Sequence, residues 1–363
     1  MNKLMIGSLA AAVAVGLAGC SDKKDHDHEH GHDHDHAHAL KKPRELFNLA
    51  DKYTNPDGMC LKDGYVYVNM NNLAAEKPSV IARFGKDEKL EEVVALPVHP
   101  ETGFICALGI VFAQDGNLYV NDNQNFTGKG LGRSRILRVV MKDGKAEGVE
   151  TVVNGINEAN GITAFGDTLY VADTNFGTKD PYTSGVYAFK LSELSAGNPV
   201  TVKAGKDDPH CVGSFTTTGK WPVGANGIAA DDDGNVFVCN FGDAVLWKMT
   251  FDASRKVKEF KPFVDCKKAS VESLDGLQYD AEDGLLWTTD FIGNAVVCVE
   301  IHGDHAHVNI IAKNPPSDGS KGQLHAPSEC IRRGDKVYVS NISLTFGPHK
   351  AAKTHTMSVI DLF

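Results

Sequence analysis

A short pattern of polar and apolar positions recurs six times along the chain. Each copy opens on a leading residue that glycine usually follows. It continues through an apolar run, a turn built from Asp and Gly, and an aromatic-rich run that ends in Asn or Asp. The six leading residues are Asp57, Leu108, Asn160, Asn226, Asp275 and Ser328. Apolar runs on both sides of an Asp-Gly turn predict antiparallel hairpins, and sparse helical periodicity favours an all-β protein.

The spacing of the copies indicates how the hairpins assemble. Consecutive leading residues are 51, 52, 66, 49 and 53 residues apart, a period that fits four short strands per repeat. We therefore predict a six-bladed β-propeller with mostly four-stranded antiparallel blades over residues 44–363. An open β-sandwich is the alternative, and six copies in phase disfavour it.

Three finer expectations follow from the propeller fold. The apolar runs that begin at Arg135 and Ala244 are predicted to be third strands of their blades. Closure of the ring requires one end of the chain to join the other, and Glu45 to Ala50 and Met357 to Leu362 are the candidate segments. The longest spacing predicts an insertion around Lys206 to Lys220, as a loop over one face.

The N-terminus has the features of an export signal. The apolar segment from Leu4 to Leu17 is too short to span a bilayer as a mature helix. It ends in Leu-Ala-Gly-Cys20, which resembles the lipobox of bacterial lipoproteins, with Cys20 as the lipidated residue. We predict that residues 1–20 are a lipoprotein signal peptide and that lipid anchors the exported chain to the cell envelope. Ser21 resembles an outer-membrane address, facing the periplasm or the surface. An ordinary secretory signal with an incidental cysteine is the alternative.

Residues 21–43 form a polar linker that is rich in histidine. Its seven histidines are His26, His28, His30, His32, His34, His36 and His38, which alternate mainly with Asp and Glu. The linker has few apolar side chains to fold around, so we expect it to be disordered. Imidazole at this density favours Zn, Cu or Ni, and we predict that the linker binds such ions; a solvated spacer is the alternative. A smaller group, expected in a surface loop, is His302, His305 and His307.

Charge and cysteine content narrow the classes of function. The net charge of −10 at pH 7 argues against nucleic acid or an anionic lipid surface as a partner, and it suits cation binding. Seven cysteines remain besides Cys20, and they include no C-x-x-C pair. We expect them to be small core residues or disulfide partners, with at least one free thiol because their number is odd.

The polar leading residues carry the candidate chemistry. In a closed ring, equivalent positions at the start of the innermost strands approach one another around the axis. Two carboxylates and two amides would then be directed at one point, from Asp57, Asn160, Asn226 and Asp275. Oxygen ligands of this kind suit Ca²⁺, and less often Mg²⁺ or Mn²⁺. The alternative is that these side chains cap backbone groups that line the channel.

The repeat and its leading residues resemble the SMP-30/gluconolactonase group of calcium-dependent propellers, which includes the diisopropylfluorophosphatase-like enzymes. The resemblance covers the chain from about residue 45 to its end. In that group the metal ligands come from blades one, three, four and five, as Glu, Asn, Asn and Asp. The matching positions here are Asp57, Asn160, Asn226 and Asp275. Asp57 replaces the usual Glu with a shorter carboxylate, so the site is expected to be looser or water-bridged.

The resemblance implies metal-assisted hydrolysis of a lactone or related ester, including organophosphates, as small-molecule substrates. Asp275 is the candidate base or nucleophile, and His325, Glu329 and Glu158 lie near inner-strand starts and are candidates to assist. For His325 a structural role is the alternative. Three polar residues at strand ends are expected to be structural: Asn121, Asp122 and Asp173.

A second class of function is compatible with the same fold. Propellers of the NHL-repeat and strictosidine-synthase-like groups share this architecture, and several of them hydrolyse nothing. The alternative is therefore a non-catalytic propeller lipoprotein that binds a protein partner or handles metal.

Overall fold

The computed structural model describes residues 39–363, apart from residues 51 and 129. The predicted signal peptide, Cys20 and the seven histidines of the linker lie outside the described residues. The chain divides into two units, residues 1–39 and 40–363, and the second contains every strand given below. Among the described residues, none of the helices is long and apolar enough to cross a bilayer.

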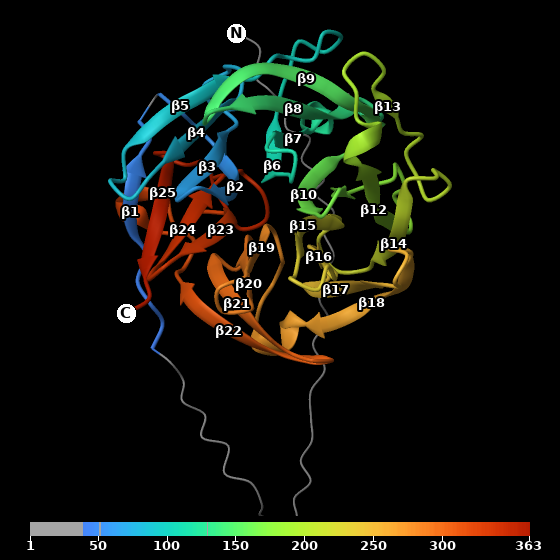
Figure 1. Ribbon diagram of the computed structural model, residues 1–363. Helices are drawn as coiled ribbons and strands as arrows, with labels where there is room; N and C mark the ends of the chain where they lie inside the picture. The colour runs from blue at the N-terminus through green and yellow to red at the C-terminus, as the bar shows by residue number, and fades with distance from the viewer. Residues whose placement is uncertain (1–38, 51, 129) are drawn as a thin grey trace, which may run out of the picture. The chain divides into compact units, whose positions relative to one another are not determined.

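The second unit is a six-bladed β-propeller with very little helix, as the repeat predicts. Figure 1 shows the six sheets arranged in a ring around a central axis. The first blade is β2 (Pro56–Lys62), β3 (Tyr65–Met70), β4 (Val80–Phe84) and β5 (Leu90–Ala95). The second is β6 (Ala107–Phe112), β7 (Leu118–Asp122), β8 (Ser134–Lys142) and β9 (Lys145–Ile156). The third is β10 (Ala159–Phe165), β11 (Thr168–Asp173), β12 (Tyr182–Lys190) and β14 (Cys211–Thr217).

The remaining blades follow the same plan. The fourth is β15 (Ala225–Ala230), β16 (Val236–Asn240), β17 (Val245–Phe251) and β18 (Val257–Asp265). The fifth is β19 (Leu277–Asp280), β20 (Leu285–Asp290), β21 (Ala295–His302) and β22 (His305–Lys313). The sixth is β23 (Pro327–Arg333), β24 (Lys336–Asn341), β25 (Thr356–Asp361) and β1 (Arg44–Asn48). Four short 3₁₀ helices lie in the connections: η1 (Gln124–Thr127), η2 (Leu191–Glu193), η3 (Cys266–Ala269) and η4 (Ser320–Gly322).

The two ends of the propeller chain close the ring, through the two segments that the sequence predicts. β1 pairs antiparallel with β25 and is the outermost strand of the sixth blade. Arg44 and Asp361 strengthen this seam with two hydrogen bonds of 2.8 and 3.1 Å between their side chains. Six apolar clusters, one at each contact between neighbouring blades, form the core.

The predicted third strands are confirmed as β8 and β17, but the boundaries of the insertion are wrong. Cys211–Thr217 is β14, the outer strand of the third blade, rather than part of a loop. The extra residues precede it, and they include β13 (Val200–Thr201), which pairs in parallel with β9 and adds a fifth strand to the second blade. The seven cysteines of the propeller are all free, and six of them are buried. Of the two alternatives for these residues, core packing is therefore observed and disulfide pairing is not.

The inner strands of neighbouring blades approach so closely that only glycine fits after most leading residues. A Cβ atom on Gly58 would lie 2.2 Å from the carbonyl oxygen of Leu108, and one on Gly161 would lie 2.3 Å from that of Asn226. The same contact recurs at Gly109, Gly227 and Gly276. Real Cβ contacts are never this short, so the glycines allow the ring to contract around its axis and bring the leading residues together.

Replacing one of these glycines tests the close approach. Gly161→Ala would force the inner strands of blades three and four apart, and we expect a loss of about 1–3 kcal/mol in the free energy of unfolding. Gly148→Ala is the matched control, since a Cβ there meets nothing within 4 Å. Urea unfolding of both variants measures the difference, and equal stabilities would contradict the packing described above.

Candidate functional site

The leading residues lie where the inner strands begin, at one end of the ring that we call the channel mouth. In blades one to four the pairing with the second strand shifts register at this position, for example between Pro56 and Met59 and between Ala159 and Ile162. Each shift inserts one extra residue on the inner strand, which is a β-bulge. The leading residues of these four blades therefore lie within β-bulges, where the regular alternation of side chains is interrupted.

The polar residues that end the second strands support the loops of the channel mouth, as expected for structural residues. Asp173 accepts hydrogen bonds from the backbone of Glu158 (2.8 Å) and Asn157 (3.3 Å), and Asp122 accepts one from the backbone of Cys106 (3.0 Å). Asp122 is also paired with Arg135 at 2.7 Å, and both side chains are buried. Asn121 likewise donates to the carbonyl of Asn160 at 2.7 Å. These residues fix the segments that lead into the inner strands.

Three of the four predicted ligands have polar partners that lie on the axis or beside it. Asp57 lies near the side chains of Ser328 of blade six and Asn71 of its own blade, whose polar groups act to lower its pKa. Asp275 lies near the side chain of Asn226 of the neighbouring blade, which acts to lower its pKa, and its charge interacts with that of Asp57. The structure therefore brings Asp57, Asn226 and Asp275 into one polar group.

Asn160, the fourth predicted ligand, faces the wall between blades three and four. Its side-chain nitrogen donates to Thr174 Oγ1 at 3.2 Å, and Thr174 donates in turn to the carbonyl of Ala225 at 2.6 Å. Since the nitrogen has this partner, the amide oxygen of Asn160 is the atom left to accept a bond or a cation.

Glu329 completes the axial group from a position that glycine occupies in the other five blades. A Cβ on Gly276 would lie 2.5 Å from Glu329 Oε1, so the carboxyl group of Glu329 fills the space over that glycine. Gln278 of blade five donates to Glu329 Oε2 at 3.3 Å and to the carbonyl of Met59, in blade one, at 2.9 Å. This bridge crosses the channel just inside the ring of leading residues.

The carboxyl groups on the axis are held in an environment that disfavours their charges. Burial raises the pKa of Asp57 to about 7, although the nearby polar groups of Ser328 and Asn71 oppose the shift. Burial and the charge of Asp57 raise the pKa of Glu329 to about 8, against the hydrogen bond from Gln278. Burial, followed by the charges of Asp57 and Glu329, raises the pKa of Asp275 well above its usual value.

This donor set fits a hard divalent cation. Among the described residues, the groups that shift these three pKa values are carboxyls, amides, a hydroxyl and a backbone N–H, with no Lys, Arg or His side chain. Three buried acids without a basic partner are short of positive charge. No set of three His, Cys, Asp or Glu side chains in the described part of the chain could hold an ion alone. An axial cation would therefore also need amide oxygens from Asn160 and Asn226.

The two other candidate assistants lie in separate environments. His325 is fully buried beside His349, with 5.8 Å between the ring centroids, and burial lowers its pKa. The charges that act on it come from His349, His355 and Asp318, and not from the axial carboxyls. Glu158 accepts hydrogen bonds from the side chains of Asn125 and Asn175, and burial raises its pKa to about 7.

An aromatic cluster covers part of the channel mouth. Phe346 packs against Phe241 and Phe291, which follow the second strands of blades four and five, with ring centroids 6.3 and 6.1 Å apart. Trp221 lies on its other side at 5.5 Å. We call these four residues the mouth cluster.

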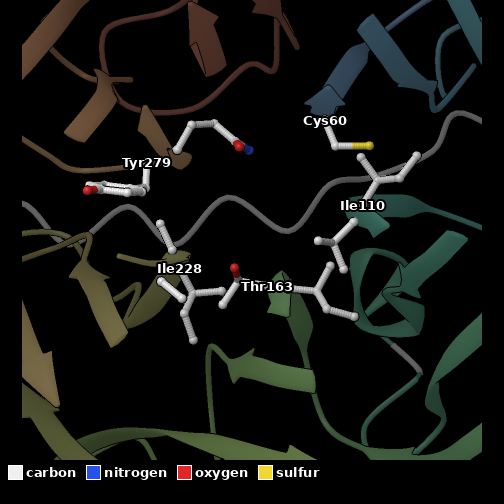
Figure 2. Close-up of a pocket in the computed structure, with 10 residues that line it drawn as sticks. Cys60, Ile110, Thr163, Ile228 and Tyr279 are labelled. Carbon is white, nitrogen blue, oxygen red and sulfur yellow. The ribbon is translucent and has the colours of Figure 1, made fainter. Parts of the chain in front are cut away.

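On the axis beyond the leading residues lies a cavity of about 90 Å³. Figure 2 shows five of its residues, one from each of the inner strands of blades one to five: Cys60, Ile110, Thr163, Ile228 and Tyr279. Most of its lining residues have apolar side chains, although most of the surface exposed to the cavity is polar. The volume is smaller than the roughly 300–1,000 Å³ of usual ligand pockets. The cavity therefore suits a few waters better than a substrate.

Sequence reasoning missed Gln278 and the mouth cluster. Gln278 had a detectable signal: the equivalent residues three positions after the other leading residues include Cys60, Val111, Thr163 and Ala229, so it is the long polar side chain of that row. The cluster had none, because its aromatic residues come from loops that are far apart in the chain.

Comparisons with known proteins agree with the fold. No family model and no curated protein matches the chain. A solved luciferin-regenerating enzyme is similar over 89% of this chain and 97% of its own, with a TM-score of 0.58 and 16% identity. The calcium-binding protein regucalcin from Agrobacterium tumefaciens matches over 89% and 94%, with a TM-score of 0.54 and 12% identity. A PQQ-bound aldose sugar dehydrogenase from Streptomyces coelicolor matches over 89% and 98%, with a TM-score of 0.54 and 18% identity. At these identities the likeness shows a shared propeller fold.

The raised pKa values predict how stability depends on pH in metal-free protein. A carboxyl whose pKa is higher in the folded state keeps its proton after the unfolded chain has lost it, above about pH 4. Its contribution to stability is therefore complete below that pH and is lost as the pH rises toward 7 to 8. We expect the free energy of unfolding in EDTA to fall between pH 5 and 8, and added Ca²⁺ to oppose the fall.

A substitution isolates the axial part of this effect. Glu329→Gln should reduce the slope of stability against pH, whereas Glu282→Gln, at an exposed position, should leave it unchanged. Urea unfolding at several pH values measures both slopes. If the slope for Glu329→Gln equals that of the unsubstituted protein, the pKa of the Glu329 carboxyl is not raised in the folded state.

Proposed function

We propose that this protein is a divalent-cation-dependent hydrolase of lactones or related esters, with Ca²⁺ as the preferred ion. The observation that carries the proposal is the group of buried carboxyls and amides on the axis, which lacks a basic side chain to balance it. The sequence resemblance to the SMP-30/gluconolactonase group supports it, and so does the structural likeness to a calcium-binding regucalcin.

The residues of the site have distinct roles in this proposal. Asp57, Asn160, Asn226 and Asp275 would hold the cation. A bound cation supplies Lewis acidity, which polarises the carbonyl oxygen of the substrate and orients water. Asp275 is partly exposed, whereas Asp57 and Glu329 are buried, so it is the carboxylate that accepts a proton from the attacking water. Glu329 is fixed by Gln278 and can hold a proton near neutral pH, which suits it to protonate the leaving oxygen.

Removal of the cation or of the base should abolish turnover. EDTA, or the substitution Asp275→Asn, is expected to lower hydrolysis of the substrates found in a panel of lactones and aryl esters by about 10²- to 10⁴-fold. Asp143→Asn, in an exposed hairpin turn, is the matched control and should retain full activity.

Thermal unfolding of each variant separates loss of chemistry from loss of fold. If EDTA and Asp275→Asn both leave the rate unchanged, the hydrolase proposal is wrong. If the folded, Ca²⁺-loaded protein turns over nothing in the panel, the second function below is favoured.

The second candidate function is a non-catalytic propeller that binds a partner or handles metal. The mouth cluster favours it, because it is an aromatic group at the end of the ring where the leading residues lie, and its residues Trp221 and Phe346 are partly exposed. The small size of the cavity on the axis supports the same view.

We also propose that Cys20 is lipidated and that the mature protein is anchored to the cell envelope. Support comes from the Leu-Ala-Gly-Cys sequence after the apolar segment. Several acyl chains on one residue give firm membrane binding, since each buried CH₂ contributes about 0.8 kcal/mol.

Cell fractionation tests the anchor. In a bacterium that processes lipoproteins, the unsubstituted chain should sediment with membranes, and Cys20→Ser should lose the lipid and leave the membrane fraction or remain unprocessed. Cys60→Ser, which alters a buried cysteine of the propeller, is the control and should stay with the membranes. Membrane association that survives Cys20→Ser in a processed chain would exclude lipid at this residue as the anchor.

A further inference from the structure

The outer hairpin of blade five gathers histidines on one face. In the pairing of β21 with β22, His302 lies opposite His305, and Glu300 lies opposite His307. Residues two apart along a strand point to the same side, so these four side chains share one face of the hairpin. The predicted surface loop of histidines is thus a strand pair, with only Gly303 and Asp304 forming the turn.

The opposite face of the hairpin fixes the orientation of this group. Ile301, Ala306 and Val308 alternate with the four residues and pack into the apolar cluster between blades four and five. A slip of one residue would expose these apolar side chains, so the register is firmly set. The histidine face is thereby held outward, and the side chains of His302 and His305 are 49% and 74% exposed.

Distances within the group are short enough for shared ligation. The ring centroid of His302 lies 5.7 Å from that of His305 and 5.8 Å from that of His307. His302 Nε2 lies 3.8 Å from Glu300 Oε2. Asn309 donates to Glu300 Oε1 at 2.8 Å, which holds this carboxylate in place and leaves Oε2 toward the histidines.

The side chains as they stand do not yet surround one point. Among the described residues no three such groups are close enough together to hold an ion. Ligands to Zn²⁺ must reach about 2.0–2.2 Å from the metal. Exposed side chains reach new rotamers without disturbing packed neighbours, and Cβ atoms opposite each other on paired strands lie only about 4.5–5.5 Å apart. Closing the site therefore requires these exposed side chains to change rotamer.

The ligand types select the metal. Three imidazoles and one carboxylate suit Zn²⁺, Cu²⁺ or Ni²⁺, whereas Ca²⁺ prefers oxygen ligands. We propose that His302, His305 and His307, with Glu300 as the fourth ligand, form a surface site for a transition-metal ion such as Zn²⁺. This site is independent of the axial carboxyls and of the proposed hydrolase activity.

The experiment uses the full chain, with the seven histidines of the linker replaced by serine so that they do not bind the probe. ZnCl₂ is titrated calorimetrically into this protein in the presence of excess Ca²⁺, which occupies the axial oxygen ligands. We expect one equivalent of Zn²⁺ to bind. The triple substitution His302→Ala, His305→Ala and His307→Ala should remove that equivalent, and Glu300→Gln should weaken its binding.

His210→Ala is the matched control, because His210 also lies beside two acids, 2.9 Å from Asp208 and 3.6 Å from Glu193. It should leave the equivalent intact. Side-chain NMR of the histidines should show shifts for the three hairpin residues on Zn²⁺ addition. The proposal is overturned if no equivalent binds, if the triple variant still binds it, or if His210→Ala removes it. Thermal unfolding of each variant shows that the propeller remains folded.

Discussion

The closeness of the inner strands at the axis is the constraint on which the rest of the molecule depends. Backbone meets backbone there: the N–H of Gly227 donates to the carbonyl of Asp275 at 2.9 Å, and that of Gly276 donates to Ser328 at 2.8 Å. Such contacts require that no Cβ intervenes. The glycines after the leading residues therefore set the radius of the ring, and the radius determines which of the leading side chains can touch.

The sixth blade shows what happens when that rule changes. Glu329 replaces glycine, and its carboxyl occupies the space above Gly276, beside Gln278. The channel is thereby narrowed by a group that also adds a third buried acid to Asp57 and Asp275. Burying like charges together costs free energy unless protons or a cation compensate. The close packing that forms the ring therefore also buries carboxyl groups that need protons or a cation to balance their charge.

The sequence was sufficient for the fold because the repeat is carried by local signals. Asp-Gly turns, alternating apolar runs and regularly spaced leading residues each indicate the same hairpins, and their period gives the number of blades. The position of the leading residues could be predicted for the same reason. The boundaries of the insertion could not, since Cys211–Thr217 is a strand of mostly small and polar residues that resembles a loop.

Features that depend on distances across the ring were beyond reach of the sequence. The bridge from Gln278 to Met59 joins blades five and one, and it exists only because the channel is as narrow as one side chain. The approach of Phe346 to Phe241 depends on how a long loop of the last blade folds back. The contact between His325 and His349 could not be predicted from the sequence either, because His349 lies on that same loop.

Two classes of candidate metal ligand are separated in the folded propeller, and the separation has a physical basis. Carboxylates and amides are on the axis, where burial and the lack of basic side chains favour a hard cation. Imidazoles are at the rim of blade five, exposed on a hairpin whose other face is packed. No histidine is among the groups that act on the axial carboxyls, which disfavours an ion that prefers nitrogen there. The histidine face has a single carboxylate, which disfavours an ion that prefers oxygen. In the two proposals, the difference in ligand type between the axis and the rim therefore favours different ions at the two places.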